Sequence, residues 1–434
     1  MIYTGYSKTD SYYEFVGDGE KLIIPASEVI LVDDNSGMIT IKTKATRKAI
    51  GSLYVPSTPP TPPTPPTPSY DGQYLAFKSL DDNTFTFYNV VYDEQTEEDV
   101  TVYPSGVTYS LDNGSTWTEL TSGGTPTVHS GDTIMWKSEL IADEYAGIGM
   151  FASTGQFEVE GNIMSMKYGD NFSGQTELTD DYAFYRLFSG CTGLTSAENL
   201  VLPATTLASW CYSNMFNGCT SLTTAPELPA TTLANNCYGS MFMGCTSLTT
   251  APALTATTLA IGCYSNMFNG CTSLTTAPVL SATTLSNGCY NSMFKGCTSL
   301  VTAPALTATT LAERCYQNMF QGCTSLATAP QLPATTLAER CYYQMFQDCT
   351  SLTTSPVLSA TTLTKNCYYE MFKSCTNLSS ITCLATDISA STCTRNWVRG
   401  VASSGTFYKA STMNDWTTGY NGIPSDWTVQ DYQG

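Results

Sequence analysis

A unit of 26 residues recurs seven times through the second half of this chain, and this period constrains the fold more than any other feature. One copy reads Leu-Pro-Ala-Thr-Thr-Leu-Ala-x-x-Cys-Tyr-x-x-Met-Phe-x-Gly-Cys-Thr-Ser-Leu-Thr-Thr-Ala-Pro-x. The copies begin at Leu202, Leu228, Leu254, Leu280, Leu306, Leu332 and Leu358. A fixed period of this size predicts a solenoid, in which each unit buries its apolar face only against its neighbours. Solenoids present long regular surfaces, so the pattern favours binding and display over catalysis.

Each unit is predicted to contain one helix and one short extended segment. On a helical wheel the apolar residues between Leu207 and Leu222 fall on one arc, and the variable residues lie opposite them. Gly218 and its equivalents are placed at the helix end, where a left-handed backbone favours glycine. Residues 222–228 are predicted to form short strands that pair in parallel from copy to copy.

Seventeen cysteines fall mainly into two columns of the repeat, and both columns lie on the apolar arc. The first column is Cys211, Cys237, Cys263, Cys289, Cys315, Cys341, Cys367 and Cys393. The second is Cys191, Cys219, Cys245, Cys271, Cys297, Cys323, Cys349 and Cys375. We expect both columns to be buried as small apolar core residues. Disulfides between successive copies are the alternative, whereas zinc is disfavoured because there is no Cys-x-x-Cys and His129 is the only histidine.

The spacing Met-Phe-x-x-Cys-x-x-Leu within this period resembles the BspA-like leucine-rich repeats of bacterial surface proteins. Phe216, Cys219 and Leu222 match the core of that family's motif, and every later copy repeats them. The resemblance covers residues 181–400, about half of the chain. It implies a leucine-rich-repeat solenoid with short parallel strands, and it places the chain among adhesins and the surface proteins of phages and parasites.

The composition predicts a multidomain chain, with a β-rich N-terminal part followed by an α/β leucine-rich-repeat solenoid. Residues 1–55 are predicted to form a small β unit for anchoring or docking, and residues 56–69 a stiff polyproline linker. Residues 70–175 contain short alternating strands with turn signals such as Asn113-Gly114, which favour an immunoglobulin-like β-sandwich. Residues 176–400 form the solenoid with its caps, and residues 401–434 a capping tail.

The N-terminal unit contains a predicted β-hairpin and the main basic cluster of the chain. Residues 21–32 and 38–44 flank the turn Asp33-Asp-Asn-Ser-Gly37, which is typical of a hairpin. The candidate anchoring residues are Lys42, Lys44, Arg47 and Lys48. They form either a solvated strand face or an electrostatic contact with an acidic partner.

Composition and motifs exclude several functional classes. The net charge is −19 with only 18 basic residues, which disfavours nucleic-acid binding. No apolar run is long enough to span a membrane, and the first residues lack the pattern of a secretion signal. No nucleophile, metal or phosphate-binding motif is present, so we expect no enzymatic activity and no cofactor.

The variable side of the predicted helices is the candidate binding surface. Its aromatic, amide and basic residues are the best candidates for ligand contact, because such groups bury much area or form strong polar contacts. The candidates are Trp210, Asn236, Arg314, Arg340, Tyr343 and Tyr369. Variation on one side is also what unconstrained solvent positions produce, and one sequence does not separate the two explanations.

These features together favour a bacteriophage fibre or decoration protein, made in the host cytoplasm and located on the virion surface. The N-terminal unit would attach to a capsid or tail protein, and the repeats would bind a host surface protein or glycan. Several copies per particle would strengthen weak contacts, and a homo-oligomer is expected, with a trimer as one option. A bacterial cell-surface adhesin is the alternative, and a glycan-active enzyme is a third and more distant one.

Overall fold

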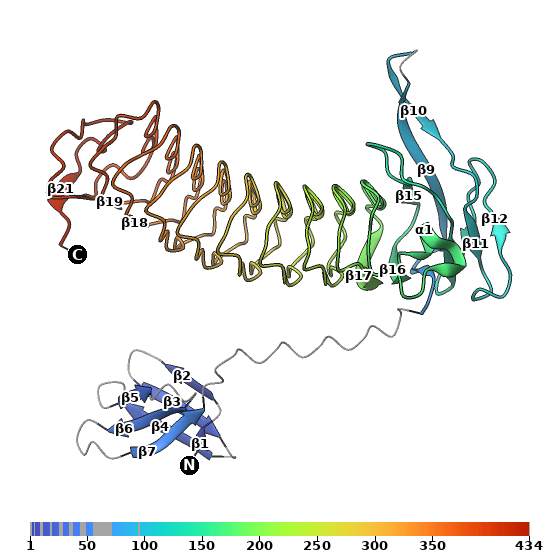
Figure 1. Cartoon of the computed structure of the whole chain (residues 1–434), viewed down its shortest axis with the longest axis horizontal. Helices are drawn as coiled ribbons and strands as arrows, with labels where there is room; N and C mark the ends of the chain where they lie inside the picture. The colour runs from blue at the N-terminus through green and yellow to red at the C-terminus, as the bar shows by residue number, and fades with distance from the viewer. Residues whose placement is uncertain are drawn as a thin grey trace. The chain divides into compact units, whose positions relative to one another are not determined.

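The computed structural model describes residues 72–93 and 96–433 with their side chains, and the backbone of seven strands between Ile2 and Tyr54. The chain divides into two compact units, Met1–Ser69 and Tyr70–Gly434, which are described separately (Figure 1). The predicted polyproline linker, residues 56–69, lies outside the described residues.

The first unit consists of two small β-sheets. Its strands are β1 (Ile2–Tyr3), β2 (Gly5–Lys8), β3 (Tyr12–Gly17), β4 (Glu20–Pro25), β5 (Val29–Asp33), β6 (Met38–Thr43) and β7 (Ala49–Tyr54). One sheet has the order β1-β7-β6-β5 and the other β2-β3-β4. The predicted hairpin is present, since β5 and β6 pair antiparallel with Asp33 opposite Ile39. Residues 21–25 were expected to belong to this hairpin, but they form β4 and pair with β3, because Pro25 ends the strand.

The second unit begins with a sandwich of two β-sheets. Its elements are β8 (Leu75–Ser79), β9 (Asn83–Asp93), β10 (Glu98–Val102), β11 (Thr108–Ser110), β12 (Thr118–Glu119), β13 (Thr127–Val128), β14 (Thr133–Lys137), β15 (Met150–Ser153), β16 (Phe157–Asn162), helix α1 (Ser165–Tyr168) and the 3-10 turn η2 (Gly169–Asn171). The predicted hairpin at Asn113-Gly114 joins β11 to β12, and both turn residues have positive φ. Phe77, Phe151 and Trp136 pack between the sheets with ring centroids 4.7–5.7 Å apart.

The sandwich continues into the solenoid without an interruption of its sheet. The larger sheet has the order β12-β11-β14-β8-β16-β17, and its last strand, β17 (Leu194–Val201), belongs to the first coil of the solenoid. β16 and β17 pair in parallel from Phe157↔Leu194 to Asn162↔Val201. Buried apolar side chains form one continuous cluster from Leu75 to Trp427. The coils therefore use the sandwich as their N-terminal cap.

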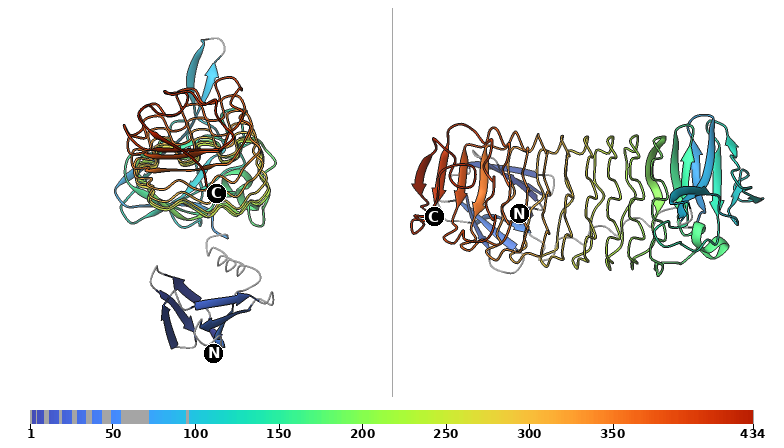
Figure 2. Two further views of the ribbon diagram at one scale, coloured as in Figure 1. Left: turned by 90° about the vertical axis from the view of Figure 1, so that its left-hand side faces the viewer. Right: turned by 90° about the horizontal axis from the view of Figure 1, so that it is seen from above.

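The repeats form stacked coils, but the prediction of one helix per repeat is wrong. Figure 2 shows the coils as successive rungs, and the segment expected to be helical is a train of turns. Alternate amides bond to the residue three positions back, as in Ser213 N–H to Trp210 C=O at 3.0 Å. The amides between them bond to the next coil, as in Tyr212 N–H to Cys237 C=O at 3.0 Å. This ladder replaces the i to i−4 bonds of a helix.

The turn train has a period of four residues, which explains the error. Trp210, Asn214 and Gly218 have φ values of 59°, 57° and 75°, so every fourth residue is left-handed. Gly218 is thus left-handed as expected, although it does not end a helix. On a helical wheel a repeat of four residues turns by about 90° per residue, whereas an α-helix turns by about 100°. Over nine residues the two directions differ by only about 80°. The apolar arc therefore fits both structures.

Parallel strand pairing is reduced to single bridges in the middle of the solenoid. Thr250, Thr276, Thr302 and Thr328 form one such column of parallel bridges. Longer strands occur only near the ends of the stack. After β17 these are β18 (Thr354–Leu358), β19 (Ser380–Cys383), β20 (Thr406–Lys409) and β21 (Thr428–Asp431). The last four strands form one parallel sheet in the order β18-β19-β20-β21.

The interior of the coils consists of columns of identical side chains. All seventeen cysteines are buried as free thiols, as the column argument predicted. The tyrosines from Tyr212 to Tyr368 stack with ring centroids 5.8–6.2 Å apart. From Cys219 on, each thiol of the second column lies near a phenylalanine carbonyl one coil back, as in Cys245 Sγ to Phe216 O at 3.1 Å. Cysteine fits because it is small and apolar and still donates weakly to this carbonyl.

Residues 401–434 close the C-terminal end of the stack. β20 and β21 add two rungs, and Trp416 stacks on Trp397 with centroids 5.6 Å apart. The indole N–H of Trp427 donates to the Ala402 carbonyl at 2.8 Å. No helix in the described part of the chain has the length and apolar character needed to cross a membrane.

Candidate functional site

The outward side chains of the turn trains form one continuous strip along the solenoid, which we call the turn face. In the first copy the strip comprises Ser209, Trp210, Ser213, Asn214 and Asn217, of which Ser213 is fully buried and the other four are half-buried, and residues 26 positions apart form columns. The neighbouring residues Cys211, Tyr212, Met215 and Phe216 point into the core and are fully buried. All six predicted ligand-contact residues lie in two columns of the turn face.

Trp210 and Asn236 lie in the first two coils and are separated from the other candidates. The Trp210 ring stacks on Tyr182 of the N-terminal cap, with centroids 6.0 Å apart and planes 7° apart. The Asn236 amide oxygen lies 2.2 Å from the point that a Cβ on Gly262 would occupy. Asn236 thus fills the space left by a glycine in the next coil, and both residues have clear structural roles.

Arg314 and Arg340 occupy the column of Trp210 and carry local ion pairs. Arg314 Nε lies 3.3 Å from Glu313 Oε1, and Arg340 Nε lies 3.6 Å from Glu339 Oε1. Lys365 Nζ is 2.9 Å from the same Glu339 oxygen, and this hydrogen bond lowers the pKa of Glu339. Both arginines have φ near 56°. The same positive φ recurs in every coil at that position. It therefore results from the backbone hydrogen bonds between coils and does not indicate a binding role.

Tyr343 and Tyr369 form the closest aromatic stack on the turn face. Their centroids are 4.6 Å apart and their planes differ by 7°, and both rings are half-buried. The guanidinium of Arg395, one coil further, lies 5.9 Å from the Tyr369 ring. Burial and the neighbouring Tyr369 raise the pKa of Tyr343. The structure therefore places Tyr343, Tyr369 and Arg395 in consecutive rungs of one column.

A ladder of amide and carboxylate side chains runs beside this column. Asn318 Nδ2 donates to Gln344 Oε1 at 2.9 Å, and Gln344 Nε2 donates to Glu370 Oε2 at 2.8 Å. Asn396 Nδ2 donates to the other oxygen, Glu370 Oε1, at 3.5 Å, and Lys373 Nζ donates to Glu370 Oε2 at 3.0 Å. Burial raises the pKa of Glu370, but the hydrogen bonds from Gln344 and Lys373 outweigh it and leave the pKa below its usual value.

Sequence reasoning missed the amide ladder and Arg395. The signal for the ladder is the column that begins at Asn214, which holds Asn, Ser, Gln or Glu in every copy. Arg395 lies 26 residues after Tyr369, beyond the seventh copy, in a segment predicted only to cap the solenoid. Extension of the 26-residue columns beyond the seventh copy identifies Arg395.

The candidate anchoring residues are only partly covered by the structure. Lys42 lies in β6, where its backbone pairs with β5 opposite Ile30. Lys44, Arg47 and Lys48 lie outside the described residues. The anchoring role of this cluster stays a prediction.

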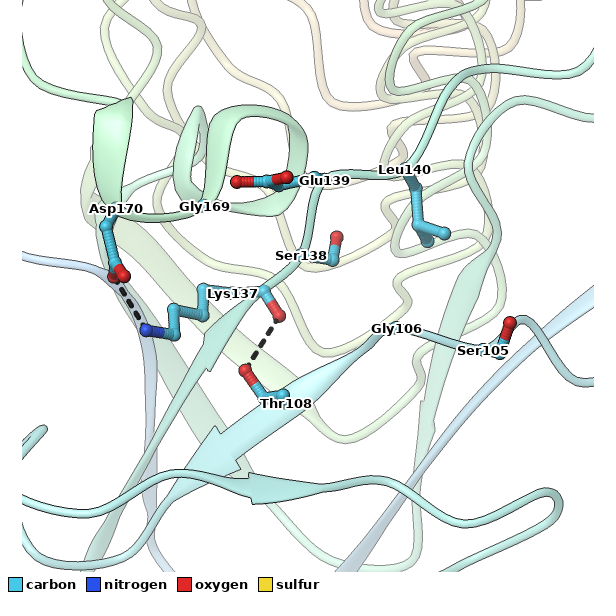
Figure 3. A pocket seen from close by; sticks show the side chains of 9 residues that line it. All are labelled: Ser105, Gly106, Thr108, Lys137, Ser138, Glu139, Leu140, Gly169 and Asp170. Carbon is cyan, nitrogen blue, oxygen red and sulfur yellow. Dashed lines mark hydrogen bonds and ion pairs between the residues drawn. The ribbon is translucent and has the colours of Figure 1, made fainter.

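A second candidate site is a shallow cavity of about 310 Å³ on the sandwich (Figure 3). Lys137 of β14 lies along its wall, with Nζ 2.6 Å from Asp170 Oδ1 and 4.3 Å from the centre of the Trp117 ring. The hydrogen bond from Lys137 lowers the pKa of Asp170. The full lining is Ser105, Gly106, Thr108, Lys137, Ser138, Glu139, Leu140, Gly169 and Asp170. Lys137 is already paired with Asp170, so within the described residues Glu139 is the charged group of the lining that has no ion-pair partner.

The single histidine lies beside a carboxylate, and the thiols of the coils are buried. His129 lies at the surface, with Nδ1 3.2 Å from Asp82 Oδ1. No group of three metal-ligating side chains gathers within the described residues. Burial raises the pKa of Cys191 to about 12, so this thiol is protonated at neutral pH.

The comparisons with known proteins gave no match to a family model, to a curated protein or to a solved structure. The resemblance to BspA-like repeats therefore stays a prediction from the motif.

Proposed function

We propose that this chain is a display protein of a bacteriophage particle, which is attached through its N-terminal unit and binds a host surface protein or glycan with the turn face. The observation that carries the binding role is the separation of the coil residues into two sets. The buried columns are nearly identical in every coil, whereas the variable aromatic residues and all the lysines and arginines of the seven copies lie on the turn face.

The construction of the coils supports a rigid binding surface. Every coil is joined to the next by backbone hydrogen bonds at alternate residues and by stacked rings. Side chains in the same column are therefore held at a fixed repeat, with little freedom to be lost on binding. Each contact is small, so several coils and several copies per particle would act together.

The attachment to virions is tested with an antibody against the full chain. We expect the antibody to detect the chain in gradient-purified phage particles and to label them in electron micrographs. Detection only on the surface of uninfected bacteria would support an adhesin instead. Hydrolysis of host polysaccharide by the purified full chain would support a glycan-active enzyme.

The binding role is tested with the full chain labelled by a fluorophore and added to host cells. We expect saturable binding, and competition by unlabelled chain. Failure to bind cells that the phage infects would refute the binding role, whatever the location of the chain.

A further inference from the structure

Charged residues are distributed unevenly along the turn face. Between Arg186 and Lys295 the sequence contains no lysine or arginine, and its only acidic residues are Glu198 and Glu227. From Glu313 onward the turn face carries six basic and three acidic side chains, and Asp348 lies beside it in the column of Gly218. The residues on the turn face are Arg314, Arg340, Lys365, Lys373, Arg395 and Arg399, with Glu313, Glu339 and Glu370. The later coils thus present a net positive strip in a chain whose net charge is −19.

The acidic groups of this strip are largely occupied, whereas two of its arginines are not. Glu313, Glu339 and Glu370 form the ion pairs described above. Arg395 and Arg399 are exposed, and within the described residues neither forms an ion pair with a carboxylate. Their guanidinium groups lie only against aromatic rings, Arg395 over Tyr369 and Arg399 over Tyr420, each at 5.9 Å. Both cations are therefore available to an anionic ligand.

Three polar atoms on the same coils lack a hydrogen-bond partner in the described part of the chain. They are Gln317 Oε1, Arg340 Nε and Gln347 Oε1. The Glu339 carboxylate, 3.6 Å from Arg340 Nε, is an ion-pair partner beyond hydrogen-bond distance. Each atom belongs to a partly exposed side chain, so rotation of the side chain would bring it to the surface. A ligand with both hydroxyl and carboxylate groups would satisfy the two acceptors and the donor.

We propose that the turn face from Glu313 to Arg399 binds an acidic polysaccharide that lies along the axis of the solenoid. This inference rests on the binding role proposed above and names the class of ligand. Carboxylate groups of the sugar chain pair with Arg395 and Arg399, and its apolar ring faces contact the half-buried Tyr343 and Tyr369. The unpaired glutamine oxygens accept hydrogen bonds from sugar hydroxyls.

The repeat distance of the strip favours a polysaccharide over an acidic peptide. Between neighbouring coils the ring centroids are 4.6 Å apart for Tyr343 and Tyr369 and 5.8–6.2 Å apart in the buried tyrosine column, and one pyranose unit adds a length close to this range to an extended chain. One sugar per coil therefore keeps its register over several coils. An extended peptide advances by about 3.3 Å per residue and loses register with the coils.

The proposal is tested by titration calorimetry of the full chain with an oligogalacturonate, with a neutral maltooligosaccharide of equal length, and with poly-glutamate. We expect the oligogalacturonate to bind most tightly, and its affinity to fall as salt is added. The double variant Arg395→Gln and Arg399→Gln should weaken this binding at least tenfold. A matched double variant, Lys78→Gln and Arg186→Gln, removes the same charge outside the strip and should leave the affinity within twofold.

Several results would overturn the proposal. These are no binding of oligogalacturonate, equal binding of the neutral oligosaccharide, tighter binding of poly-glutamate, or an equal effect of the two double variants. Thermal unfolding of each variant shows whether it is folded. If the Arg395→Gln and Arg399→Gln variant binds host cells as well as the natural chain does, the display function stands and the acidic-polysaccharide site is refuted. If the natural chain binds oligogalacturonate but is absent from virions, the site stands and the virion function is refuted.

Discussion

At the scale of single residues, the left-handed positions are the main local constraint of the coils. They recur every fourth residue and hold glycine or asparagine at most places, because these residues reach positive φ at low cost. Arg314 and Arg340 adopt the same conformation, so the hydrogen-bond ladder between coils offsets the strain of a long side chain. The backbone requirement, rather than a ligand, explains much of the asparagine on the turn face.

Substitution of Gly288 tests this requirement directly. Its φ is 61°, and a Cβ there would meet only Asn291 Cβ at 4.0 Å, so space is not limiting. We expect Gly288→Ala to lower the free energy of unfolding by about 1–2 kcal/mol, the cost of a left-handed alanine. Gly288→Asn should cost less, because asparagine tolerates this region. Urea unfolding measures both variants, and equal stability of the alanine variant and the natural chain would contradict the account.

At the scale of the element, a coil is stable only as part of the stack, where its side chains continue the columns of its neighbours. The prediction of buried cysteine and tyrosine columns succeeded because a fixed period determines which residues become neighbours. The helix prediction failed because the apolar pattern of Cys211, Tyr212, Met215 and Phe216 satisfies a helix and a train of turns equally. The second pattern, asparagine or glycine at every fourth position, distinguishes the two. The contact of Arg395 with the Tyr369 ring could not be predicted from residue type alone, since it depends on the continuation of the column beyond the last copy.

The buried columns predict a loss of stability in alkali. Burial raises the pKa of Cys237, Cys271 and Cys323 to about 12 and raises the pKa of Tyr238 above its usual value. Above pH 9 the unfolded chain releases these protons while the folded chain retains them, so stability falls as pH rises. Each such thiol should cost about 1–2 kcal/mol at pH 10 relative to pH 8.

The measurement is the urea midpoint from pH 8 to pH 10. A parallel series in high salt screens the general repulsion of a negatively charged chain but leaves the effect of burial unchanged. A midpoint that is constant across this range, or a decline that disappears in high salt, would show that the buried thiols do not control the transition.

At the scale of the whole second unit, the sandwich and the coils share one core. Phe188 of the first coil packs on Phe77 and Phe151 of the sandwich with centroids 5.8 Å away. Cys191 Sγ lies 2.9 Å from the Phe151 carbonyl. The sequence indicated a boundary near residue 175, because the composition changes there. In the structure one β-sheet and one hydrophobic core extend across residue 175.

Removal of the sandwich should therefore destabilise the coils. We expect the fragment 176–434 to unfold at a lower urea concentration than the fragment 70–434, with a loss of at least about 3 kcal/mol, comparable to the removal of one large aromatic contact. Circular dichroism during urea unfolding measures both fragments. Equal midpoints would show that the solenoid is an independent domain.

The nearly identical joints between coils have a consequence for how such a chain changes over generations. A duplicated or deleted copy re-forms the same hydrogen bonds and ring stacks with its new neighbours, and the two ends of the stack are untouched. Recombination between copies can therefore lengthen or shorten the rod by one rung, about 5 Å, in a single event. The length of the solenoid can therefore change while the rest of the protein keeps its structure.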